Sequence, residues 1–100
     1  MGNKEQLLAL ADKFVQAGYA NTDIGDDDLA LLDLKQQFSF KGKKHGRTIG
    51  INGDWERFCW FIYEKLTNEP IPDCHLRGRG FRSQFYGKTV ADAIRKVAGE

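Results

Sequence analysis

No stretch of this sequence is apolar for long enough to cross a membrane, since a transmembrane helix needs roughly 20 such residues. The first residues also lack the charged and then apolar order of a signal peptide, and they lead directly into a helical pattern. We therefore expect a cytoplasmic protein with no membrane partner.

Cysteine is scarce, and two cysteines are too few for a disulfide framework. Cys59 lies within an apolar helical run, where its expected role is that of a small buried hydrophobe. Together with Cys74, His75 and His45 it reaches the ligand count of a zinc site. None of these residues is spaced as in the paired C-x₂-C ligands of such sites, however. We therefore expect no metal and no other cofactor.

Net charge is also nearly absent, because the whole chain carries only +1. The charges are nevertheless divided unevenly along it. Residues 1–40 hold three cations against seven acids, whereas residues 41–100 hold twelve cations against seven acids. The balance argues against both a DNA mimic and a histone-like binder, and the two halves either attract one another or face different partners.

Hydrophobic spacing and capping residues predict four helices. The first runs from Asn3 to Gly18, and the second begins near Asp26 and fades near Gln37. The third spans residues 54–67, and the last begins at Thr89, with Asp92 in the position of a capping-box acid.

Residues 38–51 have a different texture, because Phe38–Phe40 and Thr48–Ile51 alternate like strands around a basic turn. This pattern predicts a β-hairpin. The expected fold class is therefore α+β: one compact domain over residues 1–100, mainly helical, with about four helices and one small hairpin.

The start of the second predicted helix carries three aspartates, Asp26, Asp27 and Asp28. Such a cluster resembles a metal site, but acids at a helix start more commonly cap it and complement its dipole. We favour the capping interpretation.

Catalytic motifs are lacking. Gly87-Lys88-Thr89 resembles the end of a phosphate-binding loop, but Arg82 stands where that motif requires a glycine. No spacing joins a serine or cysteine to either histidine as nucleophile and base. We expect a protein that is not an enzyme.

What the chain does have is a basic aromatic segment at residues 75–88, with three arginines, three glycines, three aromatic rings and no acid. Arginine binds phosphates and carboxylates bidentately, and the rings add stacking surfaces. We expect at least one of the three rings to be buried. The predicted partner-binding residues of this segment are Arg77, Arg79, Phe81, Arg82, Phe85, Tyr86 and Lys88.

Three further places are candidates for contact with a partner. Trp60 and Tyr63 lie on a helix that is apolar on more than one face, and such rings often anchor interfaces. The basic loop with Lys41, Lys43, Lys44 and Arg47 is either a solubilising turn or a secondary contact for phosphate or acidic groups. The loop with Pro70 and Pro72 is either an ordinary helix terminator or a stiff exposed turn.

The chain length, the opposite charges of its halves, the loop Asn68-Glu69-Pro70-Ile71-Pro72 and the basic aromatic segment resemble the small early proteins of temperate lambdoid phages. More narrowly, they resemble the phage anti-RecBCD proteins. The resemblance covers the whole chain through its general character and not through one specific motif.

This resemblance implies an inhibitor or modulator of the host RecBCD helicase–nuclease that acts by protein–protein contact in the host cytoplasm, so that phage recombination can use linear DNA ends. It also implies contact with a host peptidyl-prolyl isomerase at Pro70 or Pro72. Two alternatives stay open: a single-stranded nucleic-acid-binding domain, and an anti-defence inhibitor of the anti-CRISPR type.

Overall fold

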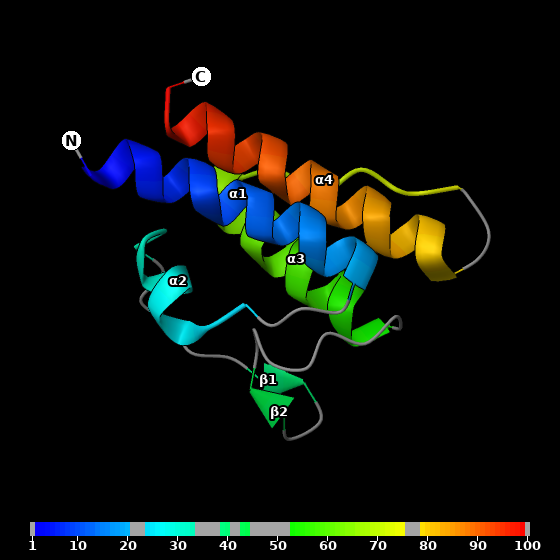
Figure 1. Ribbon diagram of the computed structural model, residues 1–100. Helices are drawn as coiled ribbons and strands as arrows, with labels where there is room; N and C mark the ends of the chain where they lie inside the picture. The colour runs from blue at the N-terminus through cyan, green and yellow to red at the C-terminus, as the bar shows by residue number, and fades with distance from the viewer. Residues whose placement is uncertain are drawn as a thin grey trace.

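A computed structural model describes residues 2–20, 24–33, 39–40, 43–44, 53–75 and 79–99. These residues are mainly helical (Figure 1). The elements, in chain order, are α1 (Gly2–Ala20), α2 (Asp26–Ala30), β1 (Ser39–Phe40), β2 (Lys43–Lys44), α3 (Gly53–Thr67) and α4 (Arg79–Val97).

The expected α+β class with its β-hairpin is wrong, because the described part of the fold is a helical assembly. β1 and β2 pair over two residues only, Ser39 with Lys44 and Phe40 with Lys43. A ladder of this length forms no layer of the fold. The second strand predicted at residues 48–51 lies outside the described residues. Alternation over three or four residues is too weak a signal to outweigh the helices around it.

The first and last helices run antiparallel, side by side (Figure 1). Asp12 of α1 reaches Arg95 near the end of α4, whereas Gly18 near the end of α1 lies against Ser83 near the start of α4. Both chain ends therefore lie at the same end of the molecule (Figure 1).

α3 and α4 run in the same direction, although they follow one another in the chain. Glu56 at the start of α3 pairs with Arg82 at the start of α4, and Thr67 at the end of α3 shares a pocket with Lys96. A parallel pair needs a connection that returns along the length of the helix. Residues 68–75 begin that return as an extended segment (Figure 1).

The proline loop is the start of this connection. Asn68 ends α3 with a positive φ of 60°. Pro70 and Pro72 are exposed and both follow trans peptide bonds, while Ile71 between them is buried and ties the segment to the core. Because proline restricts both itself and the residue before it to extended or turn conformations, the two prolines favour a chain that runs straight back and does not continue the helix.

Aromatic side chains from α1 and α3 form the centre of the core. The ring centroids of Phe14 and Phe58 are 5.8 Å apart and their planes are nearly parallel. Trp55 lies 6.1 Å from Phe14 and 5.7 Å from Phe58. Leu10 and Ala11 of α1 are fully buried as well.

A very close approach between α1 and α4 explains two of the glycines. A Cβ atom on Gly87 would lie 2.6 Å from the carbonyl oxygen of Phe14, and one on Gly18 would lie 2.7 Å from that of Ser83. No side chain fits at either place without moving the backbone. The indole Nε1 of Trp55 donates a hydrogen bond of 2.9 Å to the same Ser83 carbonyl, so α3 is bonded to α4 at the place where α1 and α4 approach.

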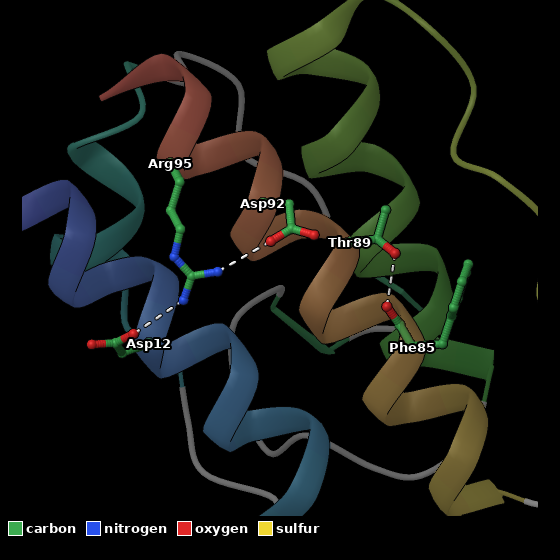
Figure 2. Close-up of polar contacts among 5 residues, drawn as sticks. All are labelled: Asp12, Phe85, Thr89, Asp92 and Arg95. Carbon is green, nitrogen blue, oxygen red and sulfur yellow. Dashed lines mark hydrogen bonds and ion pairs between the residues drawn. The ribbon is translucent and has the colours of Figure 1, made fainter. Parts of the chain in front are cut away.

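Two predicted helix boundaries are wrong. Gly18 does not end the first helix, which continues to Ala20. The last helix begins at Arg79, ten residues before the predicted start at Thr89. Thr89 is not an N-cap: its hydroxyl donates to the carbonyl of Phe85 one turn earlier, at 2.8 Å (Figure 2). From Arg79 onward, the basic aromatic segment is therefore a helix and not a loop.

Candidate functional site

α4 presents two different faces, as the 3.6-residue period requires. Ser83, Tyr86, Val90 and Ile94 are buried against the other helices. The opposite face contains an exposed ring (Phe81), a half-buried ring (Phe85), and the exposed side chains of Lys88 and Asp92. Folding the basic aromatic segment into a helix thus separates its core residues from those that can meet a partner.

The edge of α3 next to α4 carries Glu56, Trp60, Tyr63 and Thr67, at the spacing of one helical face. Glu56 is joined to α4 by an ion pair, and Tyr63 and Thr67 line a pocket with α4 residues. Trp60 lies between these contacts along the helix and keeps 43% of its surface exposed.

We call this outer boundary of the two helices the α3–α4 seam. It consists of Glu56, Trp60, Tyr63 and Thr67 from α3 and Phe81, Arg82, Phe85, Lys88, Thr89, Asp92 and Lys96 from α4.

Both carboxylates of the seam have basic partners. Glu56 pairs with Arg82, whose side chain remains 46% exposed. Asp92 accepts a hydrogen bond of 3.1 Å from Arg95, which also reaches Asp12 of α1 at 3.2 Å (Figure 2).

Two seam lysines have no such partner. Within the described ranges, neither Lys88 nor Lys96 forms an ion pair. The unpaired charge of the seam is therefore positive.

A pocket of about 220 Å³ opens at the far end of the seam. Its lining combines two hydroxyls, a phenol, a carboxylate, an ammonium group and a methyl group, from Tyr63, Thr67, Thr89, Asp92, Ala93 and Lys96. The hydroxyl protons of Thr67 and Thr89 are donated to backbone carbonyls of their own helices. The pocket is large enough for one side chain of a partner, and no constellation of nucleophile and base lies in it.

The structure brings together several of the predicted partner-binding residues but not all. Phe81 is the most exposed of them, at 60%, and Trp60, Arg82 and Lys88 are also exposed. Tyr86 is only 2% exposed, so its assignment as a contact residue is wrong, and the expectation that one ring of the segment is buried is confirmed.

Some predicted contact residues are described only in part. Arg79 begins α4, but its side chain, like the whole of Arg77, lies outside the described part of the chain. Lys43 and Lys44 form β2 without described side chains, and residues 41 and 47 lie outside the described residues. The seam is therefore defined without these six residues.

The sequence did not identify five of the seam residues: Glu56, Thr67, Thr89, Asp92 and Lys96. A signal for the first two exists in the spacing of positions 56, 60, 63 and 67, which share one helical face. That spacing does not reveal which neighbouring helix the face meets. Of the three missed residues on α4, Thr89 and Asp92 were assigned to a helix start and Lys96 to no role, because the true start of α4 was not recognised.

Cys59 is fully buried in the core, as predicted, and both cysteines are free. Burial raises the pKa of its thiol well above the ordinary value, and the nearby Glu56 carboxylate raises that pKa further. The thiol therefore stays protonated and poorly nucleophilic.

One aspartate at the acidic start of α2, Asp28, is paired with α1. Lys13 approaches both carboxylate oxygens of Asp28 at 3.0 Å. Gly25 occupies the N-cap position without a side-chain cap, so the capping half of our interpretation does not apply to these aspartates. Among the residues that the structure describes, no three His, Cys, Asp or Glu side chains gather as metal ligands would.

None of the described helices combines the length and the apolar character needed to span a membrane.

Comparison of the chain with family models, with curated protein sequences and with solved structures finds no match. Function must therefore be argued from the seam itself.

Proposed function

We propose that this protein acts by binding another protein through the α3–α4 seam. The observation that carries the proposal is the exposure of two large rings, Trp60 and Phe81, on neighbouring helices that are rimmed by charges of both signs. Exposed rings beside a polar rim are typical of protein interfaces, where tryptophan and arginine supply much of the binding energy.

The charges at the seam favour a protein over a nucleic acid as partner. Glu56 and Asp92 stand among the basic residues and occupy two of the arginines, so the seam is not the continuous basic groove that tracks a phosphate backbone. A protein partner can match such a mixed pattern residue by residue, which gives specificity. The alternative of direct nucleic-acid binding draws support only from the composition of α4, which holds five basic residues against one acid.

The resemblance to phage anti-RecBCD proteins supplies the first partner to test. In this proposal the protein is phage-encoded, and the seam docks on the RecBCD helicase–nuclease and modulates its nuclease in the host cytoplasm. The second choice is that the protein is an inhibitor of the anti-CRISPR type, whose target is a host defence complex. Exposed Pro70 and Pro72 offer a host peptidyl-prolyl isomerase an accessible segment away from the residues of the seam.

Co-purification of the full chain with RecBCD tests this proposal, followed by an assay of nuclease activity on linear duplex DNA. The double variant Trp60→Ala with Phe81→Ala should lose RecBCD retention while its circular dichroism spectrum stays unchanged. Tyr19→Ala is the matched control, because Tyr19 is an exposed ring (53%) on α1 outside the seam.

Two results would count against the proposal. Retention that survives in the double variant would remove the seam as the docking surface. A wild-type chain that retains no RecBCD but binds an oligothymidylate, with affinity falling steeply as salt rises, would favour the nucleic-acid alternative.

A further inference from the structure

We infer that the partner presents an acidic amphipathic segment to the seam, and that one of its carboxylates replaces Glu56 on Arg82. This inference rests on the proposed function and specifies the chemistry of the docking segment.

The apolar part of the segment follows from the exposed rings. Trp60 and Phe81 leave large apolar surfaces in water, and Phe85, one turn after Phe81 on α4, is only half-buried. Aliphatic side chains of a partner would cover these rings, and one further side chain fits the pocket of about 220 Å³ at the other end.

The acidic part follows from the unpaired charges. Glu56 and Asp92 are already paired, so an incoming cation would have to compete with Arg82 or Arg95 for them. Lys88 and Lys96 are unpaired within the described residues, and each ammonium group can donate hydrogen bonds directly to a partner carboxylate. They lie eight residues apart on α4, about 12 Å along its axis and roughly a quarter turn apart around it.

Arg82 is the third attachment point, but it is occupied. Its side chain is 46% exposed, whereas that of Glu56 is 19% exposed, so the guanidinium can be reached from solvent while its present partner lies deeper. Guanidinium offers five donors and binds a carboxylate bidentately. Glu56 therefore acts as a built-in competitor that a partner carboxylate must displace.

This competition gives opposite predictions for the two members of the pair. Glu56→Gln removes the competing charge and should tighten binding of an acidic segment about threefold, the size expected for a partly exposed ion pair. Arg82→Gln removes the attachment point and should weaken the same binding about threefold. Glu64→Gln is the matched control: it removes an exposed acid from the same helix but outside the Arg82 pair, and should leave the affinity unchanged.

The probe is a synthetic amphipathic helix of leucine and glutamate, titrated to millimolar concentration into the ¹⁵N-labelled full chain. The indole N–H signal of Trp60 and the amide signals of residues 81–96 should shift, and the three variants should rank as predicted. A counterpart peptide of leucine and lysine should bind more weakly. Circular dichroism of each variant verifies that it is folded.

Several outcomes would overturn the inference. If the Glu56→Gln variant binds the acidic peptide no better than the wild type, a partner carboxylate does not replace Glu56 on Arg82. The acidic segment would be ruled out as the occupant by tighter binding of the lysine peptide. It would also be ruled out if the NMR signals of seam residues shifted only with an oligothymidylate. If neither peptide binds although the Trp60 and Phe81 double variant loses RecBCD, the docking surface stands and only the acidic chemistry fails.

Discussion

Gly87 sits where the backbones of α1 and α4 approach most closely. In an exposed helix, alanine would be about 1 kcal/mol more favourable than glycine at such a position. Here a Cβ atom would lie 2.6 Å from the carbonyl oxygen of Phe14. This oxygen belongs to the backbone of α1, so it cannot avoid the clash by a change of rotamer as a side chain could. Packing therefore outweighs helix propensity at this residue.

Gly87→Ala should lower the free energy of unfolding by about 2 kcal/mol, because the two helices must move apart. Urea denaturation followed by circular dichroism measures the change. Gly25→Ala is the control: its Cβ would lie 3.7 Å from a carboxylate oxygen of Asp28, an ordinary contact, and should cost about 0.5 kcal/mol or less. Equal losses for both variants would contradict the close approach.

The buried thiol of Cys59 links stability to pH. Its raised pKa means that the folded state favours the protonated thiol more than the unfolded state does. The contribution is therefore fully present below the ordinary thiol pKa of about 8.5 and is lost as pH rises above it. Unfolding free energies measured from pH 7 to about pH 10 should fall more steeply for the wild type than for Cys59→Ala. Parallel slopes would contradict this assignment.

Among the elements, α4 shows best what the sequence can and cannot predict. The third helix was predicted to within a residue of its observed bounds, since an apolar run between Asp54 and the prolines leaves little choice. The start of α4 was missed because Gly78, Gly80 and Gly87 favour a loop, and Thr89 with Asp92 looks like a capping box. Gly87 is instead required by a contact with α1, which no local pattern can reveal.

Individual residues of the seam could be predicted from the sequence, but their assembly into one surface could not, because it depends on contacts between helices. Trp60 and Phe81 could be recognised as candidate anchors from their residue types and surroundings. Their presence on one boundary depends on α3 and α4 being parallel, and that direction depends on the path of the chain after Asn68. The burial of Tyr86 likewise follows from which side of α4 meets the core.

Helix α4 from Arg79 predicts a specific pattern of hydrogen exchange. Amides of residues 83–97 should be protected, because each follows the first turn and has a helical acceptor four residues earlier. Amides of residues 73–75, which form no backbone hydrogen bond within the described structure, should exchange rapidly. If protection began only after Thr89, the segment before it would be a loop in solution. Exchange measured by NMR in D₂O distinguishes the two.

Across the whole molecule, some charges form pairs between helices, and others leave α4 strongly basic. The interhelical pairs Lys13–Asp28 and Asp12–Arg95 involve exposed side chains, and such pairs contribute little to folding. Meanwhile α4 carries five basic residues against one acid on an otherwise nearly neutral chain. Its positive potential extends into solvent, where it can attract an acidic partner.

Salt should therefore affect binding and folding differently. Raising sodium chloride from low to physiological concentration should change the free energy of unfolding by less than about 1 kcal/mol. The same change should weaken binding of the leucine–glutamate peptide severalfold, mainly through slower association. Urea titrations and stopped-flow mixing measure the two effects. Unfolding that depends on salt as strongly as binding would mean that the ion pairs hold the fold together.

The pairing of the first helix with the last has a consequence for synthesis of the chain. Gly18 meets Gln84 and Ser83, and Asp12 meets Arg95, so these contacts close loops of more than sixty residues. Such nonlocal contacts slow folding, because loop closure must be achieved before packing rewards it. On the ribosome, α1 can meet α2 and α3 early, but the close contacts of Gly18 and Asp12 must wait until α4 has left the exit tunnel. Growth of the first three helices therefore leaves the core without the buried residues of α4.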